Sequence, residues 1–142
     1  MDFKNKKSNH HYIGALGEEI AVMYLEGRGY KTITRNYRQK WGEIDAVMKK
    51  KDKIHFVEVK SVSARVVNGE RGREKDKYNP ADNMHPFKIK RIYRAIESFL
   101  GESRNSPPAG GRKELDWQID LVSVYIDKEN QKAKVEFLEN IF

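Results

Sequence analysis

The chain has 142 residues, the size of one ordinary domain, and its aromatic share of 11% provides material for one folded core, which excludes a disordered chain. Its net charge of +7 favours an acidic partner such as nucleic acid or an anionic membrane. A basic protein whose charge only keeps it in solution is an equal alternative. The absence of cysteine excludes disulfides, thiolate metal sites and a cysteine nucleophile.

The sequence gives no sign of a membrane segment. No apolar run is long enough to span a bilayer. Residues 1–9 are rich in lysine and asparagine and lack the apolar stretch of a secretory signal, so we expect a flexible N-terminus and a cytoplasmic protein. We expect residues 10–142 to form a single domain.

An amphipathic helix is predicted from about His11 to the glycines at 27 and 29. At 100° per residue, one sector collects most of its apolar side chains: Ile13, Leu16, Gly17, Ile20 and Tyr24. Glu18 lies beside this apolar sector, near Leu25. A carboxylate in such a place is costly unless it has a partner or a cation.

Three strand-like runs follow, at residues 30–38, 42–48 and 53–60, and their short links predict an antiparallel meander. Residues 61–83 have no periodicity, and we expect them to form a long mobile loop. A second amphipathic helix is predicted at 86–100, where Pro86 suits the first turn.

Two more strands are predicted at residues 117–126 and 134–141, after a loop rich in proline and glycine. The resulting order is helix, three strands, helix, two strands. This order predicts an α/β or α+β fold in which helices flank one central mixed sheet.

Three charged residues near the strand ends are candidates for chemistry. Alternation puts Glu58 and Lys60 on one face of their strand, where the apolar row of Ile54 and Phe56 stops. The hairpin register decides whether Asp45 joins them. A link with an even number of residues sets Asp45 opposite Glu58, and an odd link sets them on opposite faces.

Two carboxylates that meet across a strand pair repel each other, and a divalent cation relieves that repulsion. Oxygen ligands suit Mg²⁺ or Mn²⁺. In this hypothesis Glu18 completes the cluster, and Lys60 orients a water molecule or stabilises charge on a phosphate. The alternative is structural: Glu-x-Lys is a common cross-strand ion pair, and Asp45 is a turn or edge residue.

The combined motifs closely resemble the YraN-like family of small bacterial proteins described as endonucleases. The resemblance covers nearly the whole chain and rests on Gly14, Gly17, Glu18, Ala21, Tyr24 and Leu25, then Gly29 and Tyr30, then residues 35–38, 42–45 and 56–60. Later matching positions are Asn79, Pro80, Lys88, Asp120 and residues 138–142.

That family is similar to archaeal Holliday-junction resolvases and belongs to the PD-(D/E)XK nuclease superfamily. The resemblance implies a restriction-endonuclease-like fold. It also implies catalytic roles for Glu18, Asp45, Glu58 and Lys60, with the carbonyl of Val59 as a further metal ligand. The chain departs from the pattern at Val62, where the family usually has a basic residue, and in its longer segment at 61–83.

Basic residues elsewhere are candidates for phosphate contacts, although a solvated surface explains such charges equally well. These candidates are Arg35, Arg38, Lys40, Arg71, Arg73, Lys88, Lys90, Arg91 and Arg94. Trp41, in a link, suits stacking on an exposed base, whereas Tyr37 is expected in the core. The histidines show no ligand spacing, and no histidine metal site is expected.

Three functions remain open at this point. The first is an Mg²⁺- or Mn²⁺-dependent endonuclease acting on DNA, with branched or junction DNA implied by the resemblance. Paired cutting of a junction requires a symmetric homodimer. The second is an inactive nucleic-acid-binding module, and the third is a protein-interaction domain whose charge serves solubility.

Overall fold

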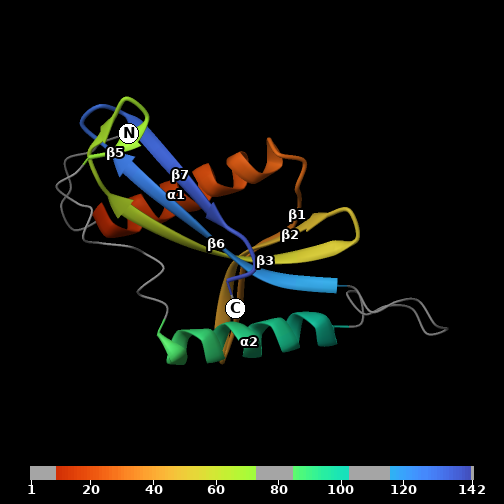
Figure 1. Cartoon of the computed structure of the whole chain (residues 1–142). Helices are drawn as coiled ribbons and strands as arrows, with labels where there is room; N and C mark the ends of the chain where they lie inside the picture. Colours follow the sequence, from red (N-terminus) through yellow and green to blue (C-terminus); the bar gives the residue numbers. More distant parts are fainter. Residues whose placement is uncertain (1–8, 73–84, 103–115, 142) are drawn as a thin grey trace.

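The computed structural model describes residues 9–72, 85–102 and 116–141 (Figure 1). Two helices are present there, α1 (Asn9–Glu26) and α2 (Pro86–Gly101). The strands are β1 (Lys31–Gln39), β2 (Gly42–Lys50), β3 (Lys53–Ser63), β4 (Val66–Val67), β5 (Glu70–Arg71), β6 (Asp116–Asp127) and β7 (Lys132–Leu138). Within these ranges, neither helix is long and apolar enough to cross a membrane.

Five strands form the central sheet in the order β1-β2-β3-β6-β7, and β4 pairs with β5 in a small separate hairpin. Strands β3 and β6 run parallel, and the other neighbouring pairs are antiparallel. Helix α1 packs on one face of the sheet and α2 on the other (Figure 1). The predicted element order, with a central mixed sheet between helices, is therefore confirmed.

Strand β3 supplies both faces of the core because its side chains alternate. Val57 and Val59 pack with Ala21 and Leu25 under α1. Phe56 faces the other way and meets Phe99 of α2 edge to face, at 5.6 Å between ring centroids. Burial on both faces explains the nearly continuous apolar run of this strand.

The expectation of an irregular segment from residue 61 to 83 is wrong for its first part. Strand β3 continues to Ser63, because its parallel partner β6 extends that far, with Ser63 opposite Ile126. Strands β4 and β5 then form a hairpin around Asn68 and Gly69, both with positive φ. Asn-Gly favours such a two-residue turn. Residues 73–83 of the segment lie outside the described residues.

Helix α1 lies very close to β3 at Gly17. A Cβ atom built there would lie 1.7 Å from the Ser61 hydroxyl oxygen and 2.7 Å from the Ser61 Cβ. Rotation of the hydroxyl cannot remove the second clash. The glycine therefore sets how closely α1, and with it Glu18, lies on the sheet.

We expect Gly17→Ala to destabilise the protein by about 1–3 kcal/mol, because overpacking pushes α1 away from β3. Urea unfolding would measure the change. The loss of stability caused by Gly17→Ala should be smaller in a Ser61→Gly background. Gly14→Ala is the matched control, since no atom lies within 4 Å of the added Cβ. It should stabilise α1 by roughly 0.5–1 kcal/mol. Equal costs at both glycines would contradict this account.

Candidate functional site

The hairpin between β2 and β3 has the register that sets Asp45 on the side of Glu58. Its link is the residue pair Lys51 and Asp52, so Lys50 lies opposite Lys53. Continued along both strands, this register brings Asp45 opposite Glu58. The even link is therefore the one that the chain adopts.

The two strands part where Asp45 and Glu58 meet. Pairing between β2 and β3 ends at Ala46 and Val57. Beyond that point β2 continues with β1 and β3 continues with β6. The site is thus a fork between two strands, and it lies between the layers of α1 and α2 (Figure 1).

At this fork the Asp45 side chain accepts the hydrogen bond that a backbone carbonyl of β2 would accept if the two strands were still paired. The backbone N–H of Val59 donates to the Asp45 carboxylate Oδ2 at 2.8 Å. The N–H and C=O of one strand residue point to the same side of the strand. The Val59 carbonyl therefore faces the same gap as Asp45 and adds a third oxygen-bearing group to the site.

Burial and repulsion make ionised Asp45 unfavourable. Desolvation and then the neighbouring Glu58 carboxylate raise the pKa of Asp45 to about 8, against the lowering effect of the Val59 hydrogen bond. A hydrogen bond also joins the two carboxyl side chains. At neutral pH the pair therefore retains a proton.

Two lysines face Glu58, whose side chain is almost fully buried. The Lys88 Nζ lies 2.7 Å from Glu58 Oε1, and the Lys60 Nζ lies 3.6 Å from the same oxygen. Burial, followed by contact with Lys88, lowers the pKa of Lys60. Burial also lowers the pKa of Lys88, but its contacts with Glu58 more than offset this, so that pKa is raised overall.

Glu18 lies near the pair without joining it. Desolvation raises its pKa, Arg35 opposes that shift, and Glu43 and Glu58 add to it. Its charge in turn raises the pKa of Asp45. Among the described residues, however, no three acidic or histidine side chains are close enough together to hold a metal ion. The structure thus brings together Asp45, Glu58 and Lys60, and leaves Glu18 at the side.

Lys88 was expected to contact nucleic acid, and its place beside Glu58 was not foreseen from the sequence. Helical spacing contained a signal, because Lys88 lies one and two turns before Ile92 and Ile96, which are buried against the sheet. A lysine on that stripe points toward the sheet. Its partner Glu58 lies 30 residues earlier, and spacing alone does not identify it.

Apart from Lys88 and Arg73, the candidate phosphate-binding residues lie in three places. Lys90, Arg91 and Arg94 are exposed on α2. On β1 and its link to β2, Arg35 pairs with Glu19 at 3.0 Å, Arg38 lies 3.7 Å from Glu43, and Lys40 covers the Trp41 ring.

Arg71 lies apart from these two groups. It belongs to the β4–β5 hairpin, far from α2 (Figure 1). Its guanidinium group donates to the Tyr125 hydroxyl at 3.2 Å and lies over the Tyr125 ring. Arg73 lies outside the described residues. Tyr37 is buried against Phe99, which confirms its place in the core.

The fold and site define an α+β protein with a carboxylate pair, one member buried and one half-buried, flanked by two lysines. Residues 17–124 match the model of the family described as "Uncharacterised protein family UPF0102". The chain belongs to the UPF0102 family. It is 38% identical over 125 residues to a UPF0102 protein of Chlorobium phaeobacteroides, covering 88% of this chain and 85% of that protein.

Two other relatives match over similar lengths. A UPF0102 protein of Campylobacter hominis is 30% identical over 128 residues, which is 90% of this chain and 91% of that protein. A UPF0102 protein of Clostridium acetobutylicum is 30% identical over 139 residues, covering 97% and 95% of the two chains. The similarity therefore extends across the whole sheet and both helices.

Asp45→Asn should change how stability depends on pH. The pKa of Asp45 is raised from 3.8 to about 8 on folding, so the native state binds more protons than the unfolded state between these values. The contribution of the Asp45 carboxyl group to the free energy of unfolding is therefore fully present below about pH 4, and it is lost as pH rises to about 8. Asparagine keeps a carbonyl oxygen for the Val59 N–H and removes this loss.

Urea unfolding in chelator at pH 5 to 8 would test this difference. The stability of Asp45→Asn relative to the original chain should increase with pH. The exposed turn residue Asp52 supplies the control, because Asp52→Asn should shift stability by a similar small amount at each pH. Parallel curves for Asp45→Asn and the original chain would contradict the assignment.

Proposed function

We propose that this protein is a metal-dependent endonuclease that hydrolyses phosphodiester bonds in DNA. The observation that carries the proposal is the meeting of half-buried Asp45 and buried Glu58 at the strand fork, with Lys60 beside them. The resemblance to the PD-(D/E)XK superfamily supports it, because Asp45, Glu58 and Lys60 match that motif. The cytoplasm, where bacterial DNA lies, is the proposed location.

The residues at the fork fit Mg²⁺ or Mn²⁺. Two carboxylates and the Val59 carbonyl are hard oxygen donors, which these cations prefer. Mg²⁺ is commonly held by one or two carboxylates together with substrate phosphates and water, so a third acidic ligand is not required. The proton that Asp45 retains is one that a divalent cation would replace. Glu18 is close enough for its charge to raise the pKa of Asp45.

When bound, the cation would lower the pKa of a water molecule and neutralise charge on the phosphate. The protein residues supply the remaining effects. Lys60 is partly buried at the fork and can donate to a phosphate oxygen, where an ammonium group stabilises developing charge. Lys88 neutralises the charge of Glu58 in the metal-free protein, and once a cation replaces it there, Lys88 can provide a second positive charge for the phosphate.

An inactive nucleic-acid-binding module is the second candidate. The specific observation in its favour is the 2.7 Å contact of Lys88 with Glu58, which neutralises that carboxylate without a metal. Such a module would bind DNA in chelator and would leave it intact when Mg²⁺ is added.

Glu58→Gln should reduce cleavage by at least about a hundredfold, because it removes a charged ligand from the site. The assay follows linear, nicked, flapped and four-way DNA in Mg²⁺ or Mn²⁺. Glu70→Gln is the matched control: Glu70 is exposed and pairs with Lys134, so its loss should leave cleavage unchanged. If the purified original chain leaves every substrate intact in both metals, the endonuclease proposal fails.

Lys88→Met should strengthen Mn²⁺ binding several-fold, because it removes the ammonium group that occupies Glu58 in the metal-free protein. Titration calorimetry at fixed pH would measure the affinity. Lys90→Met changes the same charge on an exposed position of the same helix, where salt screens it, and should have little effect. Weaker Mn²⁺ binding by Lys88→Met would mean that Lys88 supports the metal site instead of competing with the metal.

A further inference from the structure

Trp41 has no place in either half of the core. The residue is 58% exposed and lies in the two-residue link between β1 and β2. Isolated exposed apolar residues are ordinary on protein surfaces, so exposure alone indicates nothing. Two further features distinguish this position: the backbone beneath it is held firmly, and the charges around it are mostly of one sign.

The link that carries Trp41 is pressed against α2. Gly42 is buried, and a Cβ atom built there would lie 2.0 Å from the carbonyl oxygen of Arg91. Only glycine permits the hairpin tip to approach the helix backbone this closely. The backbone beside Trp41 is therefore held next to α2, and little backbone ordering remains to be done when a ligand binds there.

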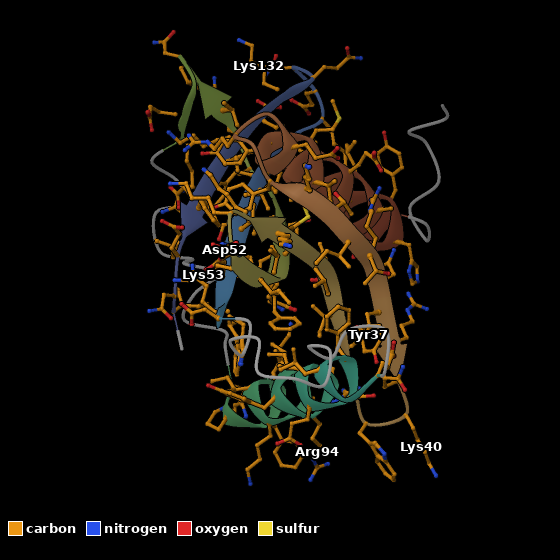
Figure 2. All side chains as sticks on the ribbon, turned by 90° about the vertical axis from the view of Figure 1, so that its right-hand side faces the viewer. Tyr37, Lys40, Asp52, Lys53, Arg94 and Lys132 are labelled. Atoms are coloured by element: carbon orange, nitrogen blue, oxygen red, sulfur yellow. The ribbon has the colours of Figure 1, made fainter. Side chains whose placement is uncertain are left out.

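The surroundings of Trp41 are basic. The Lys40 Nζ lies 4.8 Å from the centroid of the Trp41 ring. Figure 2 shows Lys40 and Arg94 at the same end of the molecule, with Lys132 at the opposite end. The exposed cations at this end are Arg38, Lys40, Lys90, Arg91 and Arg94, and the exposed acidic residues beside them are Glu43 and Glu97. We call these cations and Trp41 the basic end.

We propose that the basic end binds nucleic acid that has unpaired nucleotides, with Trp41 stacking on an unpaired base and the cations of α2 contacting phosphates. This inference rests on the proposed function and names its substrate class. A base within a duplex is already stacked on both faces, so an indole ring can stack only on a terminal or unpaired base. The cations attract the phosphates of any sequence.

The position of Trp41 along β2 connects this surface to the carboxylate site. Trp41 precedes Asp45 by four residues. At about 3.3 Å per residue, this step spans at most about 13 Å. That length corresponds to roughly four nucleotides of one strand at about 3.4 Å each. A strand whose base stacks on Trp41 can therefore reach Asp45 and Glu58 with a phosphate a few nucleotides away.

The test measures binding in chelator, so that it does not depend on cleavage. Fluorescence anisotropy would compare a duplex with an unpaired thymidine flap against a fully paired duplex of the same length. Trp41→Ala should weaken binding to the flapped DNA by about 5- to 150-fold, the range for loss of one base–aromatic stack, and change duplex binding by less than about twofold. Trp41→Phe should retain most of the preference.

Two control variants separate stacking from charge and from general apolar loss. Lys40→Ala should weaken binding to both DNAs alike and lower the slope of affinity against salt by about one. Met23→Ala removes another exposed apolar side chain, on α1, and should change neither affinity. The chain has one other tryptophan, Trp117, so a Trp117→Phe background leaves Trp41 as the single tryptophan fluorophore. In that background flapped DNA should quench the fluorescence of Trp41, and anionic phospholipid vesicles should not shift its emission wavelength.

The proposal is overturned if the original chain binds both DNAs equally, or if Trp41→Ala and the original chain bind flapped DNA with the same affinity. Vesicle binding through Trp41 without DNA binding would also overturn it and assign the basic end to a membrane surface. Absence of cleavage in magnesium leaves this result intact, and so separates failure of the endonuclease proposal from failure of the binding proposal.

Discussion

The register of one hairpin determines most of the site. Because the link between β2 and β3 has two residues, Asp45 and Glu58 face each other at the point where their strands part. A register shifted by one residue would send one of these carboxylates to the opposite face of the sheet. The same parting leaves the Val59 N–H for Asp45 and opens the gap where two acidic groups and two lysines meet.

The charges in this gap explain why α2 belongs to the site as much as the sheet does. Two carboxylates this far out of water, Glu58 buried and Asp45 half-buried, would be costly without counter-charges. Asp45 holds its proton, with a pKa raised to about 8 by desolvation and by Glu58. Lys88, on helix α2, places its ammonium group beside Glu58 of the sheet. Contact between α2 and Gly42 holds Trp41 beside the same helix, so one helix connects the carboxylates to the basic end.

Local patterns predicted the element order and reduced the placement of the two carboxylates to two hairpin registers, because both depend on residues close in sequence. Features that depend on distant partners were not predictable in this way. Strand β3 reaches Ser63 only because β6 runs parallel beside it, and Lys88 meets a glutamate on another layer. Asn68-Gly69 was a visible turn signal, but its flanking strands are only two residues long. Glu18 was predicted to complete the cluster with Asp45 and Glu58, but among the described residues no three such side chains are close enough together to hold a metal ion.

The central claim is that Asp45 and Glu58 share one divalent cation. Crystals soaked in Mn²⁺ and measured at the manganese absorption edge would test it most directly. We expect an anomalous peak in the fork, with oxygen atoms of both carboxylates and of the Val59 carbonyl at about 2.1 Å, and with Lys88 moved away from Glu58. A fork without a peak, in which Lys88 keeps its contact with Glu58 at saturating Mn²⁺, would contradict the claim.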